Sequence, residues 1–293
     1  MSVAIVTDST CDLSADFLAR YHVSTVPLTI EIGQESYRDR VDLDPVAFLA
    51  DLPHLAEQPK TAAPAPGLFR AAYEERLAQG ADGVLSIHLA GGLSATVRSA
   101  ETAARMVDGP IAVIDGESAS LGTGLLVWWA ALRARAGVDL ETLAQEVNAL
   151  KQGLFAIIAP VTLEYLARGG RIGQAARLVG TLLDMKPILM LERGSVRPER
   201  RVRGERQIVP AVLASLAARV PQGTPVLAAI GHSGDAQAFS VLQEGARGHV
   251  DVLGWLDGVV GPVVSSHVGP DAYGLIILPL TPEQAQQFKE AMA

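Results

Sequence analysis

Hydroxyl and carboxylate side chains follow several short apolar runs in the first half of the chain. They occur in Thr7-Asp8-Ser9-Thr10, in Gly91-Gly92-Leu93-Ser94-Ala95-Thr96 and in Asp115-Gly116-Glu117-Ser118. In an open α/β sheet such segments gather at the carboxyl ends of the strands, where ligands bind. Each segment taken alone is also typical of a helix N-cap, because these side chains accept hydrogen bonds from backbone N–H groups. The residue types favour a polar site at this edge without defining its ligand.

Ser94 has the most informative surroundings of these hydroxyls. Gly91 and Gly92 precede it, and a helical pattern follows it. A helix N-terminus offers free N–H groups and a positive partial charge, so a carboxylate or a phosphate would be stabilised there. The chain has no G-x-x-x-x-G-K-[ST] phosphate-binding loop, so we do not expect ATP to bind by that route.

His267 and a run of arginines are the other groups suited to an anion. The segment from Gly261 to Pro270 predicts an apolar strand that ends in a loop at His267. Lone histidines are more often structural than ligand-binding, but the flanking glycines permit close approach of a ligand. Glutamates interleave with the arginines, which indicates a charge-balanced hairpin face with one or two arginines able to clamp an anion. The arginines are Arg193, Arg197, Arg200, Arg201, Arg203 and Arg206.

Two segments approach the pattern of a serine hydrolase. In Gly231-His232-Ser233-Gly234-Asp235 the last position, which the sharp nucleophile turn reserves for a small residue, is Asp235, and Gly116-Glu117-Ser118-Ala119-Ser120 ends in Ser120. Neither segment fits well, so the pattern disfavours a hydrolase. We expect no metal site, because the histidines show no paired ligand spacing with each other or with Cys11. They are His22, His54, His88, His232, His249 and His267.

The elements that must position these groups alternate between strand and helix in the first half. Short apolar runs followed by helical stretches indicate buried parallel strands with helices on both faces of the sheet. Pro27 favours an edge position for the strand that contains it. The predicted strands are 3–6, 25–30, 83–87 and 110–115, and the predicted helices are 14–21, 94–107 and 118–135.

The second half changes to an α+β pattern with hairpins, and Gly194 predicts a turn. We predict strands at 154–162, 186–191, 224–231, 249–255 and 274–280, and helices at 163–168, 174–183, 207–219 and 235–245. The sequence therefore predicts two domains. Residues 1–154 would form an N-terminal three-layer α/β/α domain with a parallel sheet, and residues 155–293 a C-terminal α+β domain.

Composition limits the classes of partner. The 293 residues carry a formal net charge of −8, which disfavours general binding to nucleic acid or anionic membrane. The single cysteine excludes an intramolecular disulfide and fits the cytoplasm. We expect no signal peptide, and the apolar stretch from Leu121 to Leu132 is too short to span a bilayer. A hydrophobic fraction of 49% is consistent with a large α/β core or with an apolar ligand cavity.

Taken in order, several motifs resemble the DegV family over nearly the whole chain. They are Val6-Thr7-Asp8-Ser9-Thr10, Leu93-Ser94-Ala95-Thr96, Leu163 to Ile172 (LEYLARGGRI), Lys186-Pro187-Ile188-Leu189 with Arg203, and Gly261-Pro262 through His267-Val268-Gly269-Pro270. The resemblance implies a two-domain α/β protein that holds a long-chain fatty acid in a buried tunnel between its domains. It also implies a lipid-binding carrier and not an enzyme. An ATP-dependent fatty acid kinase subunit would phosphorylate the bound carboxylate, and the acyl phosphate would enter phospholipid synthesis.

Carried over by position, the resemblance implies a ligand-binding set and no catalytic residue. Thr61 and Ser94 would bind the carboxylate, and His267 would lie beside it. Arg171 and Arg203 would lie near the opening, where they would orient the acid or contact the kinase. No cofactor is expected besides the fatty acid itself as ligand.

The chain departs from the family pattern near these residues. The segment Thr61-Ala62-Ala63-Pro64-Ala65 lacks the further hydroxyls that are common there. Ala95 replaces a glycine after Ser94, and Ala90 and Gly91 stand where serines are common. We therefore expect a polar pocket with fewer hydroxyls than is usual in the family.

Two other functions remain open on the sequence. The chain could be a stand-alone hydrolase or phosphotransferase that acts on a small acyl or phosphorylated substrate, and the purified chain alone would then show turnover. It could also be a DNA-binding regulator, which its acidic balance disfavours. We expect no nucleic-acid partner and no stable membrane insertion.

Overall fold

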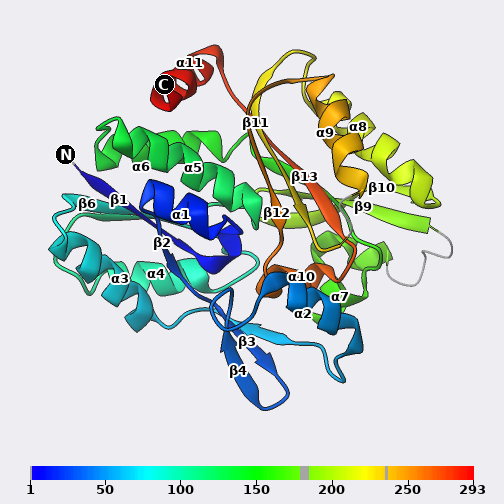
Figure 1. Ribbon diagram of the computed structural model, residues 1–293, viewed down its shortest axis with the longest axis horizontal. Helices are drawn as coiled ribbons and strands as arrows, with labels where there is room; N and C mark the ends of the chain where they lie inside the picture. The colour runs from blue at the N-terminus through cyan, green and yellow to red at the C-terminus, as the bar shows by residue number, and fades with distance from the viewer. Residues whose placement is uncertain (1, 179–184, 235–236) are drawn as a thin grey trace.

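Two large sheets lie side by side along the long axis of the molecule (Figure 1). The computed structural model describes residues 2–178, 185–234 and 237–293, and the strands in these residues form three sheets. Within the same ranges, no helix is both long enough and apolar enough to cross a membrane.

The first sheet is parallel and has the strand order β2-β1-β6-β7. Its strands are β1 (Val3–Asp8), β2 (Ser24–Val26), β6 (Gly83–His88) and β7 (Ile111–Asp115). One face packs on α1 (Ala15–Tyr21), α5 (Leu121–Arg135) and α6 (Leu140–Leu150), and the other on α3 (Pro66–Ala78) and α4 (Thr96–Ala104). Because helices cover both faces, these strands are apolar on both sides. The predicted three-layer α/β/α arrangement is confirmed.

The second sheet is mixed and has the order β10-β9-β8-β13-β11-β12. Its strands are β8 (Phe155–Ala159), β9 (Met185–Glu192), β10 (Ser195–Arg203), β11 (Pro225–His232), β12 (Asp251–Val259) and β13 (Tyr273–Pro279). One face packs on α8 (Ile208–Arg219) and α9 (Gln237–Arg247). The opposite face shares a hydrophobic core with α5 and the first sheet.

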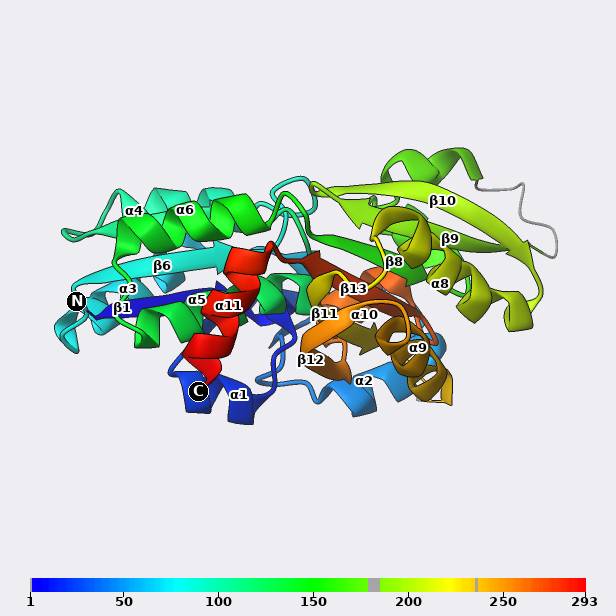
Figure 2. The same ribbon diagram turned by 90° about the horizontal axis from the view of Figure 1, so that it is seen from above.

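The last helix, α11 (Pro282–Met292), returns from the second sheet to pack on α5 (Figures 1 and 2). Its Phe288 stacks on Trp129 with ring centroids 6.3 Å apart and meets Trp128 edge-on at 5.2 Å. The apolar core therefore continues across the predicted boundary at residue 155. The division into residues 1–154 and 155–293 stays a prediction.

A small antiparallel sheet, β4-β3-β5, extends from the first half of the chain. It consists of β3 (Thr29–Ile32), β4 (Glu35–Arg38) and β5 (Lys60–Ala62), and α2 (Pro45–Asp51) lies within the same segment. The single strand predicted at 25–30 was wrong, because the chain leaves the first sheet after β2 and enters this one at β3. Pro27 has no N–H for a strand ladder, and the next N–H, that of Leu28, donates to Ser9 Oγ at 3.0 Å.

His267 lies in a helix and not at the end of a strand, so that prediction was also wrong. It belongs to the last turn of α10 (Pro262–Val268), which packs against α7 (Glu164–Arg168). Gly261 is the extended N-cap and Pro262 is the first helical residue, a position that suits proline. Gly269 ends the helix with φ of +79°, a conformation that favours glycine.

The remaining predicted elements agree within a few residues, with one change of helix type. Part of the helix predicted at 174–183 is a 3₁₀ helix, and its last residues lie outside the described ranges, as do the first two residues of the helix predicted at 235–245. The turn at Gly194 is confirmed, with φ of +69° between β9 and β10. Short 3₁₀ helices occupy Ser9–Cys11, Leu52–His54, Gly173–Leu178 and Glu205–Gln207.

Candidate functional site

A cavity of about 320 Å³ lies between the second sheet and the N-terminal half of the chain. Pockets for small molecules commonly measure about 300–1,000 Å³, and an apolar protein cavity of about 150 Å³ already holds benzene. Most of the lining is aliphatic, and the second sheet and α10 contribute Ile158, Leu189, Leu191, Ile276, Val263 and Val264. The cavity is therefore suited to an apolar ligand.

Four of the five residues predicted to bind a ligand line this cavity: Thr61, Ser94, Arg171 and His267. Arg203 does not. It is exposed on β10, where it pairs with Met185 of β9. The role of Arg203 at an opening or at a partner surface stays a prediction.

Thr61 and His267 come together from β5 and α10, with Thr61 Oγ1 lying 2.9 Å from His267 Nε2. The other ring nitrogen, Nδ1, is buried without a hydrogen-bond partner in the described part of the chain. Burial lowers the pKa of His267 to about 4, and the nearby charge of Arg171 adds to this effect. The imidazole is therefore neutral at neutral pH and carries one N–H.

Arg171 ties the loop that carries Ser94 to the end of α7. Its Nε donates to Leu93 O at 3.0 Å, and its Nη1 donates to Gly169 O at 2.6 Å. In the described part of the chain these bonds use two of the five guanidinium N–H donors, which leaves the others for a ligand. Gly169 has no room for a side chain, because a Cβ there would overlap Nδ1 of His267.

Ser94 lies just before α4, which begins two residues later than predicted. Its Oγ lies 2.9 Å from Thr96 Oγ1 and accepts the Thr96 N–H at 3.3 Å. The hydroxyl therefore supports the first turn of α4, and Ser94 is one of the residues that line the cavity. The predicted helix N-terminus is present, with Ala95 as its N-cap.

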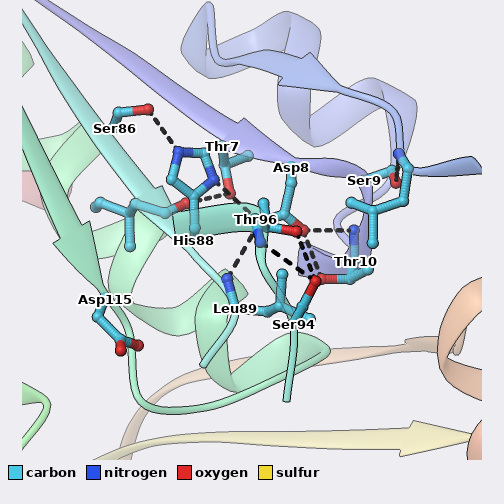
Figure 3. Close-up of polar contacts among 12 residues, drawn as sticks. Thr7, Asp8, Ser9, Thr10, Ser86, His88, Leu89, Ser94, Thr96 and Asp115 are labelled. Atoms are coloured by element: carbon cyan, nitrogen blue, oxygen red, sulfur yellow. Dashed lines mark hydrogen bonds and ion pairs between the residues drawn. The ribbon is translucent and has the colours of Figure 1, made fainter. Parts of the chain in front are cut away.

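Two carboxylates anchor the loop that presents Ser94 (Figure 3). Asp8 Oδ2 accepts the N–H of Leu89 at 3.1 Å, and both carboxylate oxygens of Asp115 accept the N–H of Gly91 at 3.1 Å. The sequence placed Asp8 and Asp115 at strand ends as helix caps or ligand groups. In the structure Asp8 caps the 3₁₀ helix Ser9–Cys11 by accepting the Thr10 N–H, and both carboxylates also position the backbone of the loop.

Ser86, His88 and Asp8 form a hydrogen-bonded series beside this loop that resembles a Ser-His-Asp triad (Figure 3). His88 Nδ1 lies 3.0 Å from Asp8 Oδ2, and His88 Nε2 lies 2.7 Å from Ser86 Oγ, which also accepts the Tyr73 hydroxyl at 2.8 Å. All four side chains are fully buried, and none lines the cavity. No substrate reaches Ser86, so the constellation is structural and not nucleophilic.

The serine segments that approached a hydrolase pattern have other partners. Ser233 is buried and donates to Gly269 O at 2.6 Å, while Asp235 lies outside the described residues. Ser120 lines the cavity but donates to a carboxylate, Asp12 Oδ2 at 2.5 Å, and not to a histidine. Among the residues that the structure describes, no cluster of His, Cys, Asp and Glu could hold a metal ion.

Asp12 joins three segments of the chain close to the cavity-lining residue Ser120. Besides Ser120 before α5, it accepts the N–H of Gly261 before α10 at 2.8 Å and pairs with Arg40 Nη1 at 3.1 Å. Burial raises the pKa of Asp12 to about 7, although Arg40 opposes this shift. Ser120 is held at φ of +54°, a conformation that few non-glycine residues adopt. These contacts fix the starts of α5 and α10 against each other.

Acid should destabilise the protein through His267. The native pKa of about 4 lies below the value of about 6.5 for an unfolded histidine, so the native state binds fewer protons. This stabilising contribution is complete above about pH 6.5 and is lost as the pH falls toward 4, by about 2 kcal/mol at pH 4.5. Urea unfolding at pH 4.5 and pH 7 should show a smaller acid effect in His267→Gln than in the unmodified protein.

His54 provides the matched control for this measurement, because its side chain is exposed. The His54→Gln variant should keep the full acid effect. An equal acid effect in His267→Gln and the unmodified protein would contradict the assignment of a neutral, buried imidazole.

Comparison with known proteins gives consistent matches over nearly the whole chain. A family model described as "Uncharacterised protein, DegV family" matches residues 2–280. A DegV domain-containing protein of Deinococcus radiodurans is 35% identical over 285 residues, which cover 96% of this chain and 100% of the relative. Another, from Streptomyces coelicolor, is 34% identical over 276 residues, covering 94% and 98%.

Solved structures agree with these sequence matches. A DegV family protein from Thermus thermophilus, described by its fatty acid binding, has a TM-score of 0.90 and 37% identity, covering 96% of this chain and 100% of its own. DegV from Bacillus subtilis, described as a fatty acid binding protein, has a TM-score of 0.83 and 30% identity, covering 96% and 100%. By sequence and by structure, the chain belongs to the DegV family.

Proposed function

We propose that this protein binds a long-chain fatty acid in its cavity and presents the carboxylate to an ATP-dependent fatty acid kinase subunit. The observation that carries the proposal is the composition of the cavity, an aliphatic interior with Thr61, Ser94, Arg171 and His267 on its lining. The Thr61–His267 contact and the Arg171 bond to Leu93 O, next to Ser94, support this grouping. Relatives described as fatty acid binding proteins support the same ligand.

The apolar part of the cavity suits an acyl chain energetically. Removing about fifteen methylenes from water is worth on the order of 12 kcal/mol gross, at about 0.8 kcal/mol for each. Ordering of the chain and association offset much of this gain. The remainder supports tight but reversible binding, as a carrier requires.

The polar part of the cavity suits a carboxylate. A buried carboxylate must be hydrogen-bonded or paired with a charge, because desolvation otherwise destabilises its ionised form. With its proton on Nε2, His267 donates to Thr61 Oγ1 and leaves the Thr61 hydroxyl proton for the ligand. The partnerless Nδ1 favours this tautomer, since a buried N–H without an acceptor is costly. Ser94 supplies a second hydroxyl, and Arg171 a positive charge.

The kinase subunit would supply ATP and transfer its γ-phosphoryl group to a carboxylate oxygen, giving an acyl phosphate for phospholipid synthesis and ADP. Because the kinase subunit uses ATP, we propose that the carrier acts in the cytoplasm. Its ligand would be the fatty acid, and it would need no cofactor of its own. Arg203 lies away from the cavity lining, so we assign it to contact with the kinase and not with the acid.

The purified protein loaded with palmitate should form no acyl phosphate when ATP and Mg²⁺ are added alone. Addition of the kinase subunit should produce acyl phosphate, which hydroxylamine converts to a measurable hydroxamate. Acyl phosphate formation or ester hydrolysis by the purified chain alone would instead support a stand-alone phosphotransferase or hydrolase. If the loaded protein and the kinase subunit together form no acyl phosphate, the proposed presentation role is refuted.

A further inference from the structure

The floor of the cavity is the face of the second sheet that turns away from α8 and α9. Strand pairing places Gly231 of β11 opposite Gly274 of β13, and Gly274 opposite Ile158 of β8. Ile158 in turn lies opposite Leu189 of β9. All four residues line the cavity. Along this row the side chains change from none, at the two glycines, to large aliphatic groups at Ile158 and Leu189.

Alternation along β13 shows that position 274 points into the cavity. Ile276 and Leu278 belong to the core on the cavity side, whereas Leu275 and Ile277 belong to the core beneath α8 and α9. Residues two apart in a strand share a face. A side chain at position 274 would therefore project toward the ligand.

The two glycines differ in the room above them. A Cβ at Gly231 would lie 3.1 Å from Val260 Cγ1 and 3.4 Å from Ser120 Oγ, so neighbours already fill that space. A Cβ at Gly274 would meet nothing closer than Ile157 O at 3.6 Å and Ile158 Cγ1 at 3.7 Å. Gly274 does not have a positive φ. Neither packing nor backbone conformation therefore requires glycine at position 274. Glycine also weakens the interior of a strand, so it has a structural cost there.

We propose that Gly274 is the position that determines which acyl chains the cavity accepts. Its missing side chain leaves a trough in the floor where the chain crosses β13. The proposal rests on the function proposed above, because it assumes an acyl ligand. A larger residue at 274 removes volume and shifts the preference toward shorter acids, since each excluded methylene loses its transfer from water.

The test compares palmitate and decanoate binding to Gly274→Ala and Gly274→Val by titration calorimetry. Palmitate affinity should fall by about tenfold or more with valine and by less with alanine, because valine excludes the equivalent of roughly two methylenes. Decanoate affinity should change by less than about threefold, because a shorter chain needs less of the volume. Thermal unfolding close to that of the unmodified protein shows that each variant is folded.

Gly258→Ala is the matched control. Gly258 continues the same row on β12, opposite Gly231, but it does not line the cavity. A Cβ there has its nearest neighbour, Asp12 O, at 3.8 Å. This variant should bind both acids like the unmodified protein.

A compensating change tests whether volume is the cause. Ile158→Ala removes the side chain nearest to position 274 and should restore palmitate binding in the Gly274→Val background. An unchanged ratio of the two affinities in Gly274→Val, or a double variant no better than it, overturns the inference while the proposed function stands. An unmodified protein that binds neither acid overturns both.

Discussion

Alanine at both Thr61 and Ser94 will weaken fatty acid binding by roughly a hundredfold or more while the fold stays intact. Both residues line the cavity, and Thr61 Oγ1 lies 2.9 Å from His267 Nε2. Hydrogen bonds to charged groups contribute about 1.5–3 kcal/mol each, so the loss of two gives an effect of this size. The measurement is an equilibrium titration with palmitate, with circular dichroism to check the fold.

Thr102→Ala is the control for the double variant. Its hydroxyl bonds to Arg98 O on the exposed side of α4, away from the cavity lining. It should bind palmitate like the unmodified protein. A Thr61→Ala/Ser94→Ala protein with unchanged affinity would show that these hydroxyls do not hold the carboxylate.

Replacing Asp8 by alanine should lower the free energy of unfolding by about 3–5 kcal/mol, because several buried donors lose their acceptor at about 1–3 kcal/mol each. Asp8 is fully buried and accepts bonds from Thr10 N, Thr10 Oγ1 and Leu89 N, besides its contact with His88 Nδ1. The variant leaves these groups buried without a partner and releases the loop that carries Ser94. Chemical denaturation measures the loss directly.

Asp139→Ala is the control, because it removes two hydrogen bonds of the same kind at a less buried site. Asp139 caps α6 by accepting Thr142 N at 3.0 Å and Thr142 Oγ1 at 2.8 Å, the same two bonds that Asp8 makes to its threonine. It is partly exposed, so its loss should destabilise the protein much less than the loss of Asp8. Equal losses in the two variants would show that the Asp8 network is not a buried anchor.

Local sequence patterns predicted most strands and helices because their apolar residues follow the periods of elements covered on one or both faces. These patterns gave wrong predictions where a proline or a glycine next to an apolar run determined the secondary structure. Pro27 ends β2, and the chain crosses to another sheet, although the apolar run continues to Ile30. Two consecutive valines after Pro262 suggested a strand, but proline at the first helical position and Gly269 at the end define a helix.

The candidate site was predicted only in part, for a related reason. Motif resemblance identified Thr61, Ser94, Arg171 and His267, which come together in the cavity. The Asp8–His88 contact was missed because it joins residues 80 apart through the parallel pairing of β1 and β6. The sequence of a single strand does not specify which strands lie next to it in the sheet. The glycine row in the cavity floor was missed for the same reason.

The most direct test of the central claim is native mass spectrometry of the protein purified from a bacterial host, followed by solvent extraction of any bound molecule. If the protein carries a long-chain fatty acid in its cavity, the spectrum will show one such acid per chain, and extraction will recover it. A protein that is empty after purification and takes up no added fatty acid would contradict the account.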